Sequence, residues 1–219
     1  MAYIIPMSNS VAPSPTDPVP DASNAKLRLV EAATSLFGEH GIEGVALKDI
    51  LERAGQKNQS AVQYHFGSKD GLVAAALKAR FLAIDARRAA MLAGLETLDR
   101  ESQRALVLRA TVEPIVVEAE SHSQGPLYVR FVAQALQRSD QLIQTHILSD
   151  AHAGFKAVMA ALARERKGPV SREELAQRIR MTMHLTMTAI ADWVAHDFGP
   201  HSREDLISRL AAANAALLL

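Results

Sequence analysis

The sequence contains no cysteine, which excludes disulfide bonds and thiolate metal sites. It also lacks the run of about 18 apolar residues that a membrane-spanning helix requires, so no membrane partner is expected. Aromatic residues make up only 5% of the chain. The 24 Lys and Arg residues balance 24 Asp and Glu residues, so no overall positive charge draws the molecule to a nucleic acid. Any affinity for DNA must therefore come from a local arrangement of side chains.

Helix-forming residues are what the sequence has in quantity. Ala, Leu, Arg, Glu and Gln dominate, and no strand-like alternation occurs. These features predict an all-α protein. The length of 219 residues and the hydrophobic content of 48% suit one compact body, or a small domain joined to a larger one. The absence of cysteine fits a reducing, cytoplasmic compartment.

The chain divides into three parts by composition and helix length. Residues 1–23 are rich in Pro, Ser and Asp, which predicts a disordered N-terminal tail. A short apolar run near its start has no basic flank and does not suit a signal peptide. Residues 24–72 carry the spacing of a first helix followed by two short ones, and residues 73–219 that of longer helices.

Local signals predict where the N-terminal helices begin and end. Gly41 and Gly55 stand where the first and second helices stop, because glycine adopts the left-handed conformation that ends many helices. Asn58 is expected to cap a third short helix that ends near His65, and Ser68 to cap a long fourth one.

Similar signals occur in the second part. Pro114 is expected to kink or break a helix over residues 102–120, and Pro126 to stand in the first turn of the next. Residues 141–166 suit one long helix, after which Ser171 and Ser202 cap the last two.

Two short helices joined by a tight glycine-containing turn, with another packed behind them, are typical of a helix-turn-helix. The third helix presents polar side chains, and a glutamine amide can pair two-fold with an adenine edge in the major groove. Lysines beside it, and the N-terminus of the fourth helix, can hold phosphates. The candidate DNA-binding residues are Lys48, Lys57, Asn58, Gln59, Ser60, Gln63, Tyr64, His65 and Lys69.

Residues 27–77 resemble the DNA-binding domain of the TetR family of bacterial transcription regulators. The matching segments are AATSLFGEHGIEG, LKDILERAG and YHFGSKDGL, in that order. The resemblance implies that residues 24–72 form a helix-turn-helix domain that binds double-stranded DNA. It also implies that Tyr64 contacts the DNA backbone and that Phe66 locks the recognition helix into the core.

The sequence departs from the family pattern at three places. Ala46 stands where Ser or Thr usually caps the second helix, and polar Gln56 stands where an aliphatic residue is common. Gln63 occupies a position that is often Tyr. The turn after the second helix also looks one residue longer, which leaves the register of the recognition helix on DNA open.

The resemblance further implies that residues 73–219 form a domain that binds an effector and makes a homodimer. In the next-to-last helix Ile179, Met183, Ile190 and Trp193 form one stripe, and Met181, Leu185 and Thr188 point elsewhere. A helix that is apolar on two sides must be buried on both. The last helix has two such rows, which are Leu206, Leu210, Ala213 and Leu217, and Ile207, Ala211, Asn214 and Leu218.

Two such helices per subunit predict a four-helix dimer interface, and the alternative is that the stripes complete a monomeric core.

Candidate effector-binding residues combine adaptable apolar side chains with one cation that suits an anionic ligand. They are Tyr128, Arg130, Phe131, His146, Met183, His184, Met187 and Trp193. Two pairs, His146 with Asp150 and Asp192 with His196, lie four residues apart, as metal ligands can. Two ligands without a third do not make a zinc site, so no metal is expected.

The sequence therefore predicts a ligand-responsive repressor that binds a palindromic operator as a homodimer, with an unknown small-molecule effector. No nucleophile–base constellation appears, so neither catalysis nor a cofactor is expected. One alternative is a helical-bundle enzyme or small-molecule carrier with a vestigial DNA-binding domain. Another is a protein-interaction module that works through the dimer surface.

Overall fold

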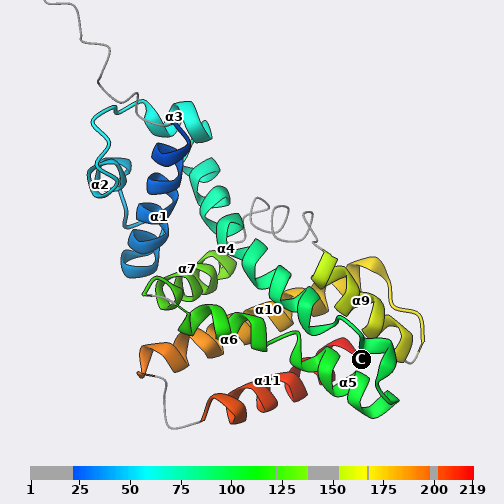
Figure 1. Ribbon diagram of the computed structural model, residues 1–219. Coiled ribbons are helices and arrows are strands. Elements are labelled where there is room, and N and C mark those ends of the chain that lie inside the picture. The colour runs from blue at the N-terminus through cyan, green and yellow to red at the C-terminus, as the bar shows by residue number, and fades with distance from the viewer. Residues whose placement is uncertain (1–21, 122, 138–152, 167, 198–201) are drawn as a thin grey trace, which may run out of the picture.

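The computed structural model describes residues 22–121, 123–137, 153–166, 168–197 and 202–219. Every regular element within these ranges is a helix, which confirms the all-α prediction (Figure 1). The predicted N-terminal tail lies outside the described residues, apart from the beginning of the first helix.

The N-terminal part has three helices, of which two are short, and the start of a long fourth. They are α1 (Ala22–His40), α2 (Leu47–Arg53), α3 (Ala61–Phe66) and α4 (Lys69–Met91). Gly41 and Gly55 have φ angles of 78° and 64°, so both take the left-handed conformation expected after α1 and α2.

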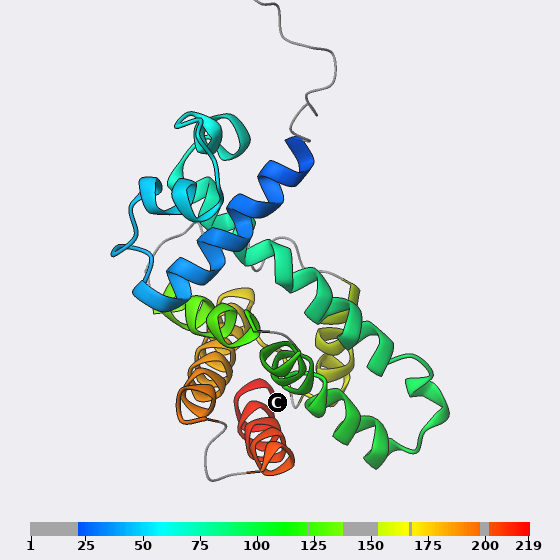
Figure 2. The ribbon, with the colours of Figure 1, turned by 60° about the vertical axis from the view of Figure 1, so that its left-hand side comes forward.

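The larger part of the molecule is a body of helices into which α4 extends from the N-terminal group (Figures 1 and 2). Its elements are the 3₁₀ helix η1 (Leu95–Thr97) and helices α5 (Arg100–Arg109), α6 (Glu113–Glu120), α7 (Gly125–Gln137), α9 (Ala153–Glu165), α10 (Arg172–Ala195) and α11 (Arg203–Leu218).

The serine caps that the sequence predicts are present at three helices. The hydroxyl of Ser68 accepts a hydrogen bond from the Gly71 N–H at 3.0 Å. Ser171 and Ser202 cap α10 and α11 in the same way, each at 3.1 Å. Pro114 stands in the first turn of α6, so it separates α5 from α6 and does not kink a single helix.

The third helix is shorter than predicted. It begins at Ala61, because the side chain of Asn58 accepts from the Ser60 N–H at 2.9 Å and folds residues 58–60 into a turn before the helix. The long helix expected over residues 141–166 is described from Ala153 onward, and its earlier residues lie outside the described ranges.

One hydrophobic core runs through both parts of the molecule. Helix α1 packs on α7, where the rings of Phe37 and Phe131 have centroids 5.3 Å apart. The contact is close because Gly38 carries no side chain. A Cβ atom there would lie 2.3 Å from the Leu127 carbonyl oxygen. The N-terminal helices are thus packed against the body by backbone-to-backbone proximity, in addition to their covalent link.

We expect Gly38→Ala to lower the free energy of unfolding by about 1–3 kcal/mol, although alanine favours helices, because α1 must move away from α7. Urea denaturation measures the change. The control Arg28→Ala alters an exposed side chain of the same helix and should stay within about 0.5 kcal/mol of the parent. A Gly38→Ala protein as stable as the parent would contradict the close packing.

Candidate DNA-binding surface and ligand cavity

Helix α3 has one face inside the protein and one face in solvent. Ala61 and Val62 are buried in the core, whereas Gln63 is exposed and Tyr64 is 81% exposed. An aromatic side chain this accessible on a six-residue helix contributes little to the core. The exposed face can therefore meet a partner.

The structure gathers most of the predicted DNA-binding residues on the solvent side of α2, α3 and the turn between them. The exposed candidates are Lys48, Lys57, Asn58, Gln59, Ser60, Gln63 and Tyr64, and the half-buried ones are His65 and Lys69. Tyr64 packs edge-on against His65, with ring centroids 4.9 Å apart.

Lys69 is engaged within the domain. Its Nζ donates to the carbonyl oxygen of Val45 at 2.6 Å and lies 6.0 Å from the centre of the Phe37 ring. This bond ties the start of α4 to the segment before α2. A phosphate role for Lys69, as the sequence predicts, would use the ammonium hydrogens that Val45 does not occupy.

Two further contacts hold α2 and α3 in place. The carboxylate of Asp49 accepts from the Ala46 N–H at 3.2 Å, so α2 retains this side-chain contact at its start although alanine cannot cap it. Phe66 is half-buried against the main core, with the Nζ of Lys26 5.9 Å from its ring centre. The contact agrees with the role expected for Phe66 as the anchor of this helix.

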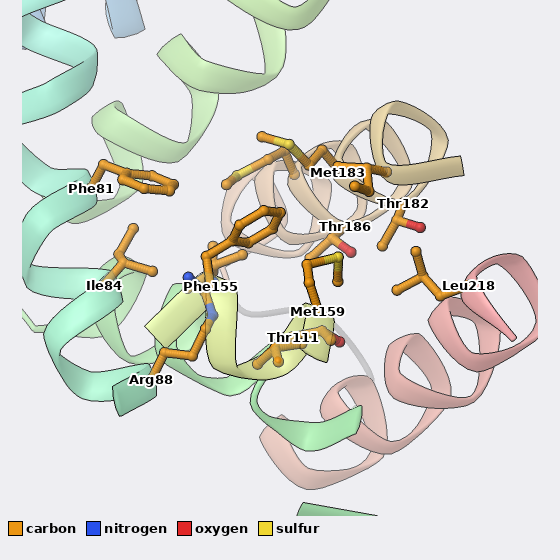
Figure 3. A pocket seen from close by; sticks show the side chains of 14 residues that line it. Phe81, Ile84, Arg88, Thr111, Phe155, Met159, Thr182, Met183, Thr186 and Leu218 are labelled. Carbon is orange, nitrogen blue, oxygen red and sulfur yellow. The ribbon is translucent and has the colours of Figure 1, made fainter. Parts of the chain in front are cut away.

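A cavity of about 60 Å³ lies in the body among α4, α9 and α10, beside the end of α11 (Figure 3). Its walls are mainly apolar, and flexible methionines from α9 and α10 form part of them. Residues that line it include Phe81, Ile84 and Arg88 from α4, Phe155 and Met159 from α9, Met183 and Met187 from α10, and Leu218 from α11.

Only two of the predicted effector-binding residues, Met183 and Met187, line this cavity. Tyr128, Phe131 and Trp193 are buried in the main core instead. Arg130 and His184 are half-buried and are not part of the cavity wall, and His146 lies outside the described residues.

Tyr128 connects α7 to α4. Its hydroxyl donates to the Leu77 carbonyl oxygen at 3.0 Å, and burial raises the pKa of the phenol. The side chain is therefore a neutral, buried link between two helices.

Arg88 lines the cavity and is absent from the residues predicted from the sequence. It is only 5% exposed, its Nε donates to the Ala110 carbonyl oxygen at 3.0 Å, and its Nη1 lies 3.3 Å from the Asp85 carboxylate. Burial lowers the pKa of this guanidinium, and Asp85 opposes that effect. Phe81, Ile84 and Arg88 recur at three- and four-residue spacing, a signal that could have placed Arg88 on the inner face.

Asp85 serves two partners at once. Besides Arg88, its carboxylate accepts from the backbone N–H groups of Gly154 at 3.0 Å and Phe155 at 2.7 Å. These groups stand at the start of α9, where the helix dipole favours a negative charge. The helix comes close because a Cβ at Gly154 would lie 2.5 Å from the Asp85 carbonyl oxygen.

A second buried polar group joins the C-terminal helices. Asn214 is fully buried, and its amide donates to Thr111 at 2.9 Å and to Thr186 at 3.1 Å. Within the described ranges no three His, Asp or Glu side chains gather as metal ligands would. None of the helices in these ranges is long and apolar enough to cross a membrane.

The geometry defines a helix-turn-helix domain, formed by α1 to α3 and the start of α4, on a helical body that contains a small apolar cavity. Residues 29–76 match the family of bacterial regulatory proteins, tetR family. A comparison with curated protein sequences gives no match.

Solved structures resemble the fold over most of the chain. The transcriptional regulator FadR from Bacillus subtilis, in complex with stearoyl-CoA, has a TM-score of 0.56 and 17% identity over 88% of this chain and 96% of its own. A putative TetR-family regulator from Mesorhizobium loti MAFF303099 has a TM-score of 0.55 and 17% identity, covering 90% and 96%. One from Rhodococcus sp. has a TM-score of 0.55 and 20% identity, covering 90% and 100%.

Residues 29–76, the N-terminal domain, thus match the tetR family of bacterial regulatory proteins. The fold of the chain is that of TetR-family transcriptional regulators. Both findings confirm the resemblance carried by residues 27–77.

We expect Asp85→Asn to lower the free energy of unfolding by roughly 3–5 kcal/mol, because the buried guanidinium of Arg88 loses its counter-ion. Urea denaturation followed by circular dichroism measures the loss. Asp192→Asn, at an exposed position of α10, is the matched control and should change stability by about 0.5 kcal/mol or less. If both substitutions had equal effects, Asp85 would not be the structural link between α4 and α9.

Proposed function

We propose that the chain is a ligand-responsive transcriptional repressor that binds a palindromic operator as a homodimer. The exposed polar face of α3, within a segment that matches the tetR family, carries this proposal. The Gln63 amide and the Tyr64 hydroxyl on that face suit base edges and phosphates, respectively. The balanced charge of the chain makes DNA recognition a local property of this surface.

An apolar stripe on the outside of the body supports the dimer. Met181 is 48% exposed and Leu185 is 39% exposed on α10, and Thr188 continues the same side. Of the two rows expected on α11, Leu206, Ile207, Leu210, Asn214 and Leu218 are buried within the subunit. The side of α11 left for a partner carries Ala212 and Ala216, both exposed. Small side chains of this kind allow two helices to approach closely.

A dimer places two copies of α3 on one DNA duplex. Half-sites read by such a pair are about 34 Å apart, or a multiple of that distance. A ligand that binds better to a conformation with another spacing lowers operator affinity, and DNA lowers ligand affinity by the same factor. The FadR structure with stearoyl-CoA is a precedent for a ligand complex on a related fold, which supports a ligand in this body.

The alternative is an enzyme or carrier in which the N-terminal domain has lost DNA binding. The buried ionic pair of Arg88 and Asp85 has structural partners on both sides, which are the backbone groups of Ala110, Gly154 and Phe155. DNA binding by the purified protein distinguishes the two functions.

We expect Lys57→Ala to weaken binding to all duplexes alike. It should also reduce the slope of the logarithm of the binding constant against the logarithm of salt concentration by about one unit, as loss of one phosphate contact does. Gln63→Ala should instead relax preference at one base pair by about 1–3 kcal/mol. Fluorescence anisotropy with the DNA upstream of the gene and a scrambled duplex, over a salt series, measures both.

The matched control for these substitutions is Lys156→Ala, an exposed lysine of α9 in the body, which should bind as the parent does. Sequence-independent binding by the parent protein, or no binding at low salt, would contradict the proposed operator recognition. Lys69 is a poorer probe because its substitution also removes the bond to Val45.

We expect Leu185→Asp to convert the dimer to monomer, because two charges would be buried against apolar surface across the two-fold axis. Light scattering after size-exclusion chromatography gives the mass. Leu98→Asp is a close control, since Leu98 is 40% exposed and lies beyond η1, away from the stripe on α10. A Leu185→Asp protein that remains dimeric would exclude this face as the interface.

A further inference from the structure

We propose that the effector is an apolar carboxylate, with its carboxylate at Arg88 and its apolar body among α4, α9 and α10. The proposal rests on the proposed function only in calling this ligand the effector. The binding itself stands on the geometry of the cavity and can be measured without DNA.

Arg88 has one donor group left over at the cavity wall. Its Nε and Nη1 are occupied by Ala110 and Asp85, and within the described ranges its Nη2 makes no hydrogen bond. Figure 3 shows the guanidinium beside Phe155 at the edge of the cavity. A ligand oxygen that reached this donor would form a charge-assisted hydrogen bond with it.

The other polar groups of the cavity wall are already paired. Thr182 donates to the Arg178 carbonyl oxygen at 2.8 Å, and Thr186 shares two hydrogen bonds with Asn214. Thr111 donates to the Leu108 carbonyl oxygen and accepts from Asn214. Among the described residues that line the cavity, Arg88 is also the only charged one. It is therefore the group that selects the polar end of a ligand.

The local charge favours an anion over a cation. The guanidinium and the Asp85 carboxylate carry opposite unit charges, and the start of α9 adds about half a positive charge beside Asp85. The sum is positive. A ligand carboxylate also accepts charge-assisted hydrogen bonds from arginine. A ligand ammonium group would be repelled by the guanidinium.

The apolar body of the ligand has room for limited length. Phe81 and Arg88 are seven residues apart on α4, which spans about 10 Å at 1.5 Å per residue. The present cavity of about 60 Å³ is smaller than the roughly 150 Å³ apolar cavity that holds benzene. Met159, Met183 and Met187 can change rotamers to enlarge it. A single short chain or one aromatic ring would fit the cavity once these methionines have enlarged it.

Isothermal titration calorimetry at neutral pH tests the polar end. The probes are octanoate, octan-1-ol and octylamine, which share one chain, with 3-phenylpropanoate as an aromatic carboxylate. We expect at least one carboxylate to bind, and octanoate to bind about tenfold or more tightly than octylamine, as a charge-assisted hydrogen bond implies. Equal binding of octanoate and octylamine, or no binding of either carboxylate, would overturn the proposal.

Two substitutions locate the site. Arg88→Met should remove the preference for octanoate over octan-1-ol while the affinity for the alcohol is retained, and Arg104→Met, at an exposed arginine, should change neither. Met183→Trp fills the cavity and should reduce octanoate affinity about tenfold or more. The control Leu82→Trp adds the same ring at an exposed position of α4 and should leave octanoate affinity unchanged.

Folding of each variant is checked by circular dichroism. If Arg88→Met does not fold, Met183→Trp decides the matter, because it leaves the ionic pair intact. Octanoate binding by Met183→Trp at the parental affinity would overturn the proposal. Carboxylate binding that leaves operator affinity unchanged would contradict the proposed regulation and leave the ligand site standing. Operator binding without carboxylate selectivity would contradict the site alone.

Discussion

Helix α4 runs without a break from the helix-turn-helix into the body. Its 23 residues extend about 35 Å at 1.5 Å per residue and contain no proline. Leu72, Val73, Ala76 and Leu77, near its start, are buried in the core that also holds α1 and α3. Its last turns carry Asp85 and Arg88 against α9. Helix α4 therefore belongs to both regions, and under the proposed function it is the element that would pass a displacement beside the cavity to the helix-turn-helix.

Buried polar groups fix how the body helices meet. Asp85 accepts from α9, Arg88 donates to Ala110 between α5 and α6, and Asn214 joins α11 to Thr186 of α10. A shift in the register of any of these helices would lower the stability of the fold, because a polar partner would be left unsatisfied in an apolar core. An apolar core alone is less specific, since aliphatic side chains can repack. The same groups leave Nη2 of Arg88 as the place where a ligand can enter the network.

Under the proposed function, the exposed surface of α3 is where a chain of zero net charge would meet DNA. Lys57 and Gln63 are exposed, and Tyr64 projects from the same helix as Gln63. Lys69 faces inward to Val45, so its charge serves the packing of the domain as well as any partner. DNA recognition by this surface would depend on the placement of a few groups, because the chain has no net positive charge.

Features that depend on a few neighbouring residues can be predicted from the amino-acid sequence alone. The caps at Ser68, Ser171 and Ser202 and the left-handed glycines follow from hydrogen bonds and sterics within four residues, and such signals can be read directly. The sequence predicts a helix cap at Asn58 where the structure has a turn, because a cap and an Asx turn use the same side chain. Tertiary structure decided which polar groups are buried together. Arg88 meets Ala110 at a separation of 22 residues, and Asp85 meets Gly154 at 69. Such pairs form only when helices pack. Local spacing can mark the inner face of α4, but the partners that complete the cavity and its charged wall come from non-local contacts.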